Sequence, residues 1–262
     1  MSVTNTYPVG GVDAPSVTTG PIPGPLDFWS TLGWLAVAAM TYVAAMMLCV
    51  AGFVIWAVAT HTYIEDIRTF AQLPLLTYLM HAVSMTSAAL VLVIPARRGG
   101  PSVRSYLALT WPQWRYIAIG LAVVAVSWSI FLGLSLLHIF PDSSREAIRE
   151  YQQILGNPWA LTVYWLVLVG TVPVAQEIVF RGFVQRGWSA SSLGGFGAAV
   201  LIAFAWAVVQ PGHNVPMMFT VFFLGLICGV MRWRSGSTVL AIMMHMAWNG
   251  ATGLYYALTM SA

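Results

Sequence analysis

Polar and ionisable side chains interrupt three otherwise apolar stretches in the second half of the chain. They are Gln176, Glu177 and Arg181 in the first stretch, Gln210 and His213 in the second, and His245 and Asn249 in the third. Carboxylate and imidazole groups can take and give protons near neutral pH, and both can ligate zinc. The set is therefore a candidate for acid–base chemistry, for a metal site, or for a buried polar network between helices.

Spacing gives the first two structural expectations. Glu177 and Arg181 are four residues apart, and so are His245 and Asn249. Residues four apart lie on one face of a helix, so Glu177 and Arg181 are expected to form an ion pair. His245 and Asn249 are expected to point in the same direction, which on its own is explained by a His–Asn hydrogen bond between packed helices.

The composition excludes a soluble protein. Of the 262 residues, 59% are hydrophobic and only 7% are charged, and the mean hydropathy is +0.79. A soluble domain carries about 25% charged residues, which it needs to cover a surface in contact with water. Soluble enzymes and nucleic-acid-binding proteins are excluded on this ground, and an integral membrane protein is predicted. Cys49 and Cys228 lie in apolar runs, which argues against a disulfide framework or a cysteine-rich metal site.

Long apolar windows set the expected fold class. A membrane helix needs about 20 mostly apolar residues, and lipid offers no partner to an open strand. The windows that qualify are residues 28–60, 71–94, 116–140, 158–180, 194–210, 216–231 and 237–260. We therefore predict an all-α, polytopic membrane helix bundle of about seven transmembrane helices, within a range of six to eight. Residues 1–25 are rich in Gly, Pro, Ser and Thr and predict a flexible N-terminal tail.

Arginine, which supplies all 11 basic residues, is unevenly distributed between the expected loops. Alternate loops hold Arg97, Arg98, Arg104, Arg115, Arg181, Arg186, Arg232 and Arg234, whereas the opposite loops hold Arg68, Arg145 and Arg149. Cytoplasmic loops carry the excess of basic residues, so this distribution predicts a cytoplasmic N-terminus. The expected location is a bacterial inner membrane, with lipid headgroups as partners of the arginines.

Three segments together resemble one known family. Residues 176–182 (QEIVFRG) are similar to the Glu-Glu-x-x-x-Arg motif of the CPBP intramembrane proteases, and residues 245–249 (HMAWN) fit the family's His-x-x-x-Asn motif. The stretch at 225–237 also resembles the family's approach to its last helix. This family includes the type II CAAX prenyl endopeptidases and the bacteriocin-processing and immunity proteins. The resemblance covers residues 158–255 and suggests a division into N-terminal transmembrane helices at 26–150 and a CPBP-like core at 151–262.

The resemblance implies a site, and the chain departs from it at two positions. In the family the first Glu of the pair activates water, and a His from a Phe-x-x-x-His motif joins the His and Asn of the last motif. Here Gln176 stands in place of that Glu, and Gln210 stands where the middle His belongs. An amide cannot act as a general base near pH 7 and is a poor zinc ligand. Glu177 points about 100° away from Gln176 on a helix, so it does not simply replace it.

Three functions follow as alternatives. The first is a proteolytically inactive homologue that acts as a scaffold or subunit of a membrane protein complex, with another integral membrane protein as partner and no cofactor. The second is an active CAAX-type endopeptidase, with Glu177 or His213 compensating or with Gln176 and Gln210 being engineered changes. Such an enzyme would cleave a prenylated or transmembrane peptide and could use zinc. The third is a proton or solute path, against which the missing internal repeat argues.

Overall fold

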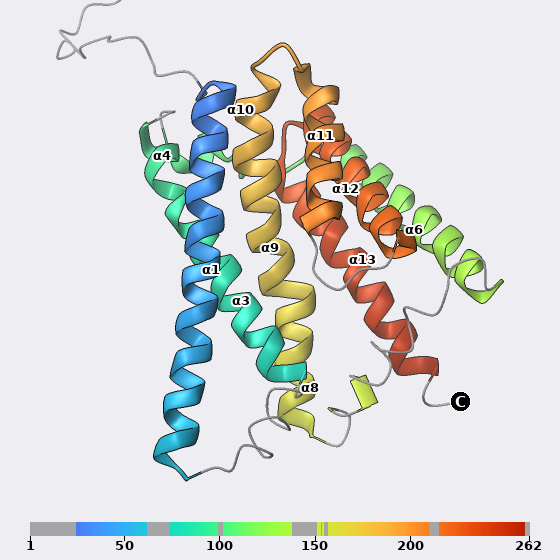
Figure 1. Ribbon diagram of the computed structural model, residues 1–262. Helices are drawn as coiled ribbons and strands as arrows, with labels where there is room; N and C mark the ends of the chain where they lie inside the picture. Colours follow the sequence, from blue (N-terminus) through green and yellow to red (C-terminus); the bar gives the residue numbers. More distant parts are fainter. Residues whose placement is uncertain are drawn as a thin grey trace, which may run out of the picture.

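The computed structural model describes residues 25–61, 74–98, 102–137, 151, 152, 154, 157–209 and 215–259, and within these ranges the regular structure is helical. Helices α1 (Phe28–Ala59), α3 (Pro74–Val91), α4 (Val93–Arg98), α5 (Val103–Tyr106) and α6 (Trp114–Leu136) form the first part. One continuous helix then runs through α8 (Pro158–Trp165), α9 (Val172–Glu177) and α10 (Gln185–Ser189). Helices α11 (Gly194–Val209), α12 (Val215–Ser235) and α13 (Thr238–Thr259) complete the bundle, which is shown in Figure 1.

Each of the seven predicted windows contains a helix in the structure. By length and composition, five of the described helices are able to cross a membrane: Phe28–Ala59, Leu75–Arg98, Trp114–Leu136, Pro158–Ser189 and Val215–Ser235. The prediction of a polytopic membrane helix bundle is therefore confirmed. The fourth window was placed too short, because the helix continues well beyond residue 180. Helix α11 is apolar but short, and α13, which contains His245 and Asn249, is not among the five.

Local sequence explains where the helices begin and end. Asp27 caps α1, since its Oδ1 accepts a hydrogen bond from the Ser30 backbone N–H at 2.7 Å. Asn157 caps α8 in the same way, and Pro158 occupies the first turn, where no backbone donor is required. Two glycines with positive φ, Gly194 (64°) and Gly236 (69°), stand at the breaks before α11 and α13, a conformation that glycine adopts without strain.

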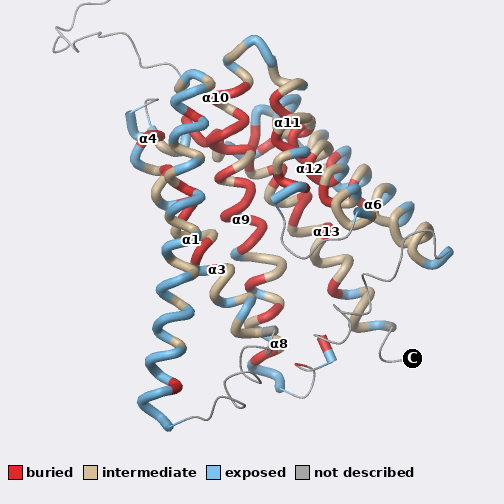
Figure 2. The backbone as a smooth tube through the Cα atoms, viewed as in Figure 1, coloured by how far each residue is buried: buried red, intermediate tan, exposed pale blue. Residues whose placement is uncertain are grey.

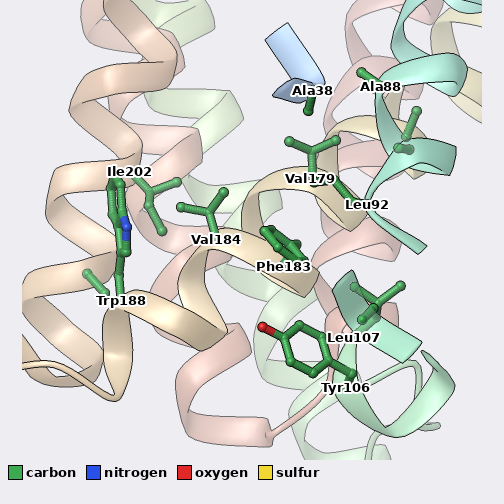
Figure 3. Packing of buried hydrophobic residues seen from close by; sticks show 14 residues of the cluster. Ala38, Ala88, Leu92, Tyr106, Leu107, Val179, Phe183, Val184, Trp188 and Ile202 are labelled. Atoms are coloured by element: carbon green, nitrogen blue, oxygen red, sulfur yellow. The ribbon is translucent and has the colours of Figure 1, made fainter. Parts of the chain in front are cut away.

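Burial is concentrated in the helices of the second half of the chain. Figure 2 shows buried residues along α9, α10, α11 and α13, whereas most of α1 is exposed. Figure 3 shows the apolar cluster around Phe183 and Val184, to which Ala38 of α1 and Leu92, between α3 and α4, also contribute. The N-terminal helices therefore cover one side of a core to which the segment 175–188 of the continuous helix contributes its apolar side chains.

Most of the described arginines lie at one end of the bundle, here called the arginine end. It comprises Arg97, Arg98, Arg104, Arg115, Arg186, Arg232 and Arg234, at the ends of α4, α10 and α12, the start of α6, and in α5. The ends of α4 and α10 lie in the upper part of Figure 1, on either side of the start of α1. Arg181 was counted with the loop arginines, and that placement is wrong, because its side chain is fully buried inside the bundle. The arginines at 68, 145 and 149 lie outside the described residues.

Candidate functional site

The helix that carries the first polar segment is interrupted by two π-helical turns. These turns are Leu166–Thr171 and Ile178–Val184, on either side of α9. In the first turn the Val172 N–H bonds the Val167 carbonyl five residues back, but the next residue, Pro173, has no N–H to give to the carbonyl of Leu168. The second turn begins immediately after Glu177 and includes Arg181. Such turns are frequent at functional sites because they re-aim side chains and free backbone groups.

Glu177 is the centre of the polar cluster. Its side chain is fully buried, and its Oε1 accepts a hydrogen bond from Arg181 Nη1 at 3.1 Å, so the predicted ion pair forms. The same Oε1 lies 2.9 Å from Nδ1 of His245 on α13. A carboxylate paired with arginine can only accept hydrogen bonds, which makes Nδ1 of His245 the donor. One oxygen atom thus joins α9, the second π turn and α13.

Arg181 extends this cluster to α11 and α12. Its Nη2 donates to the Gly225 carbonyl at 2.8 Å, and its guanidinium carbon lies 4.7 Å from the centre of the Trp206 ring. The Trp206 ring also lies 5.3 Å from the His245 ring. Gly225 is required at this contact, because a Cβ there would lie 2.9 Å from Trp206 Cε3 and 3.1 Å from Arg181 Nη2. The glycine therefore lets α12 approach the buried guanidinium.

Gln185 repeats the Arg181 contact one turn further along. It is buried, and its Nε2 donates to the Gly229 carbonyl at 2.7 Å. Arg181 and Gln185 are four residues apart, as are Gly225 and Gly229, so two side chains on one helix face reach two carbonyls on the facing helix. The sequence reasoning missed Gln185, although the matching spacings were a signal that could have identified it.

Asn249 and His245 do not pair with each other as the isolated spacing suggested. Asn249 Nδ2 instead donates to the Leu168 carbonyl at 2.8 Å. This is the carbonyl that an N–H at position 173 would meet if the π turn continued, and Pro173 has no N–H. The Asn249 amide therefore replaces the missing N–H and fastens α13 to the α8–α9 helix.

Of the remaining predicted positions the structure describes Gln176, which takes part in none of these hydrogen bonds. Gln176 is buried at 4% exposure but is neutral and adjacent to Glu177. Gln210 and His213 lie outside the described residues. Among the residues that the structure does describe, no three His, Cys, Asp or Glu side chains come close enough to hold a metal ion. Glu177 and His245 alone do not fit the four-coordinate site that zinc requires.

Comparison with known proteins assigns this segment. Residues 158–251 match the family model of the type II CAAX prenyl endopeptidase Rce1-like proteins. No curated protein and no solved structure matches the chain significantly. The match covers less than half of the chain, but it includes Gln176, Glu177, Arg181, His245 and Asn249. The predicted resemblance is thereby confirmed for residues 158–251, and the apolar helices are those of an integral membrane protein.

Proposed function

We propose that this protein is a proteolytically inactive member of the CPBP type that serves as a scaffold or subunit of a membrane protein complex. One observation carries the proposal: the remaining carboxylate, Glu177, is fully buried and uses a single oxygen for both Arg181 and His245. A general base must reach a water molecule and accept its proton. A carboxylate fixed by an arginine and an imidazole serves instead as a link between helices.

The amide at position 176 supports the same proposal. Gln has nearly the shape of Glu and can hydrogen-bond within a polar core, but it has no basicity near pH 7. The bundle therefore keeps the polar contacts that hold its helices in place while losing the group that the family uses to activate water.

The partner would be another integral membrane protein. This function needs no cofactor, and by the positive-inside rule we expect the N-terminus on the cytoplasmic side of a bacterial inner membrane.

An active intramembrane endopeptidase is the second candidate, and one observation favours it. Glu177 Oε2 is buried and has no hydrogen-bond partner within the described part of the chain. In this candidate, that oxygen accepts a proton from water next to the imidazole of His245. Prenylated or transmembrane peptides would be the substrate class, and a zinc ion would need further ligands from residues 210–214 or from substrate and water.

Cleavage in proteoliposomes separates the two candidates. The purified protein is reconstituted with a farnesylated CAAX peptide or with a single-span peptide, and product is followed by mass spectrometry with and without added zinc. The proposal predicts no more product than protein-free liposomes give. Product that forms in the wild type and disappears in Glu177→Gln would overturn it. Native mass spectrometry of the protein extracted from its own membranes tests the scaffold role, for which a stoichiometric second protein is expected and a monomer would count against it.

A further inference from the structure

The connection between α5 and α6 is buried, although connecting segments usually run over a protein surface. Tyr106, at the end of α5, and the next residues Leu107 and Ala108 are all buried. Ala108 also has a φ of 48°, in the left-handed region that a residue with a Cβ rarely adopts. Such a strained conformation persists only where neighbouring contacts impose it, and it is typical of clamps and switch regions.

Thr238 supplies the first of these contacts. It is the first residue of α13 and is fully buried. Its N–H donates to the Ala108 carbonyl at 2.9 Å, and its Oγ1 donates to the Leu107 carbonyl at 2.6 Å. Arg232 Nε, on α12, donates to the same Oγ1 at 2.9 Å. One hydroxyl group thus ties the α5–α6 connection to both α12 and α13.

Ser237 and Thr110 supply a second set of contacts. Ser237 Oγ donates to the Thr110 carbonyl, and Thr110 Oγ1 donates to the Gly236 carbonyl at 3.4 Å. Hydrogen bonds therefore run in both directions between residues 107–110 and the turn 236–238. Most of them start from a side-chain hydroxyl, so a substitution can remove them one at a time.

The inner side of the connection packs on the second π turn. A Cβ at Gly182 would lie 3.4 Å from the carbonyl oxygen of Leu107, so this residue lies directly on the helix. The Tyr106 ring lies 5.7 Å from the Phe183 ring, and Figure 3 shows Tyr106 and Leu107 beside Phe183. Gly182 follows Arg181 in the chain. The connection therefore covers the helix segment that carries the polar cluster.

The cluster lies deeper between the same helices. His245 follows Thr238 by seven residues on α13, which places it roughly 10 Å further from the arginine end. Cys228 of α12 lies between these two levels, because it is fully buried and its Sγ is 3.9 Å from the carbonyl of Ala241 on α13. Water that entered between α12 and α13 from the arginine end would reach Cys228 before it reached His245.

We propose that residues 107–110 form a strap that closes the α12–α13 pair at the arginine end, and that release of the strap opens this end of the bundle to water. Hydrogen bonds to the turn 236–238 hold the strapped state, which carries the strain at Ala108. In the released state water replaces these hydrogen bonds and the strain is lost. The two effects oppose each other, as a two-state element requires. The strap does not depend on the proposed function, because it would close the bundle of a scaffold and of a peptidase alike.

Thiol labelling at the two ends of the bundle measures release of the strap. Cys49→Ser leaves Cys228 as the one thiol of the chain. In a second reporter protein both cysteines are replaced by serine and Ala160→Cys is added, because Ala160 is buried in α8 at the opposite end of the bundle (Figure 1). The full-length proteins react with N-ethylmaleimide in mild detergent, and the rate is followed by mass spectrometry. Release of the strap exposes Cys228 alone, whereas general loosening exposes both positions.

Three substitutions are compared in both reporter proteins. Ser237→Ala removes one hydroxyl donor of the turn, and Thr238→Val removes another while keeping the shape of the side chain. Ser84→Ala is the matched control, because Ser84 is also buried but its Oγ donates to the Met80 carbonyl of its own helix, α3. A melting curve verifies that each variant is folded, and Ser237→Ala carries the test alone if Thr238→Val does not fold.

We expect Cys228 to react about threefold faster in Ser237→Ala and about tenfold faster in Thr238→Val than in the wild type, because each lost hydrogen bond favours the released state. Ser84→Ala should leave this rate unchanged, and the thiol at position 160 should react at the wild-type rate in every variant. Equal Cys228 rates in the strap variants and the control would overturn the proposal. Faster reaction at both positions would also overturn it, since it would show general loosening. Neither result would change the proposed function, which the cleavage assay tests.

Discussion

Two helices of equal length differ in almost every other respect. Helix α1 and the continuous helix Pro158–Ser189 each have 32 residues, and both are apolar enough to span a membrane. In the most apolar 18-residue window of each, 6% of α1 is buried inside the protein, against 44% of the other helix. Helix α1 carries no charged side chain, whereas the second helix carries Glu177, Arg181 and Arg186.

The difference shows what holds a membrane bundle together. Lipid tails are as apolar as leucine, so an apolar helix face gains little by leaving lipid for protein. Close packing at small residues and hydrogen bonds between helices make the attraction specific. The continuous helix Pro158–Ser189, here called the central helix, has both kinds of contact with α12. It packs closely at Gly225 and Gly229 of α12, and its Arg181 and Gln185 donate hydrogen bonds to the carbonyls of these two glycines. Helix α1 has mainly an exposed apolar surface. Substitutions in the central helix should therefore have much larger effects than the same kind of change in α1.

The largest expected effect is that of Arg181→Ala. It leaves the buried carboxylate of Glu177 without its cation and the Gly225 carbonyl without its donor. We expect the free energy of unfolding to fall by about 3 kcal/mol, as when one partner of a buried ion pair is removed. Ile55→Ala in α1 is the matched control, since Ile55 is 68% exposed, and it should change stability by less than about 0.5 kcal/mol. Denaturation in mixed micelles measures both, and equal effects would contradict the comparison.

Gly225→Ala should have the next largest effect on stability. The added Cβ would crowd Trp206 Cε3 and Arg181 Nη2, and such overpacking costs about 1–3 kcal/mol. Gly52→Ala in α1 is the opposite case, because a Cβ at Gly52 meets no heavy atom within 4 Å. Alanine is the better helix former, so Gly52→Ala should stabilise by up to about 1 kcal/mol. Melting temperatures that shift in opposite directions would support the comparison, and a stabilising Gly225→Ala would refute it.

Asn249→Ala isolates one hydrogen bond between helices. The Leu168 carbonyl, to which Pro173 can give no N–H, would lose the hydrogen bond from the Asn249 amide. A loss of about 1 kcal/mol in unfolding free energy is expected. Thr41→Ala in α1 is the control, because Thr41 Oγ1 donates to the Val37 carbonyl of its own helix and links nothing else. Its stability should stay near that of the wild type, and a greater loss than for Asn249→Ala would argue against the role of Asn249.

The smallest expected effect is on the pH dependence of stability, and it comes from a residue outside the membrane-spanning helices. Burial raises the pKa of Tyr106, in α5, above its ordinary value of 10.0. The unfolded chain then loses this proton first, so the stabilisation is complete below about pH 10 and falls as the pH rises through the folded-state pKa. Tyr106→Phe should flatten that part of the stability curve. Denaturation midpoints measured from pH 8 to pH 11 test this, and identical slopes in the two proteins would contradict it.

The fold was largely predictable because membrane spans are marked by composition. The windows at 28–60 and 194–210 end within one residue of the observed helices. The fourth window ended too early, because Arg181 was counted with the arginines of a loop and Gln185 was not considered. Within the bundle these side chains satisfy backbone carbonyls of α12, and such contacts between distant segments are not visible in one helix's sequence.

The candidate site was predictable only where its partners are close in sequence. The four-residue spacing of Glu177 and Arg181 predicted their pair. The contact between Glu177 and His245 crosses 68 residues, and the bond from Asn249 to Leu168 depends on a π turn and a proline that leave one carbonyl free. Spacing identifies a helix face, whereas the choice of partner depends on how the helices pack.

A double-mutant cycle tests most directly the central claim, that the polar cluster depends on the buried pair of Glu177 and Arg181. The unfolding free energies of Glu177→Gln, Arg181→Ala and the combined variant are measured in the same micelles. Since the single Arg181→Ala change strands a buried carboxylate, the combined variant should be more stable than Arg181→Ala alone, with a coupling energy above about 1 kcal/mol. A combined loss equal to the sum of the two single losses would show that the pair contributes nothing and would contradict the account.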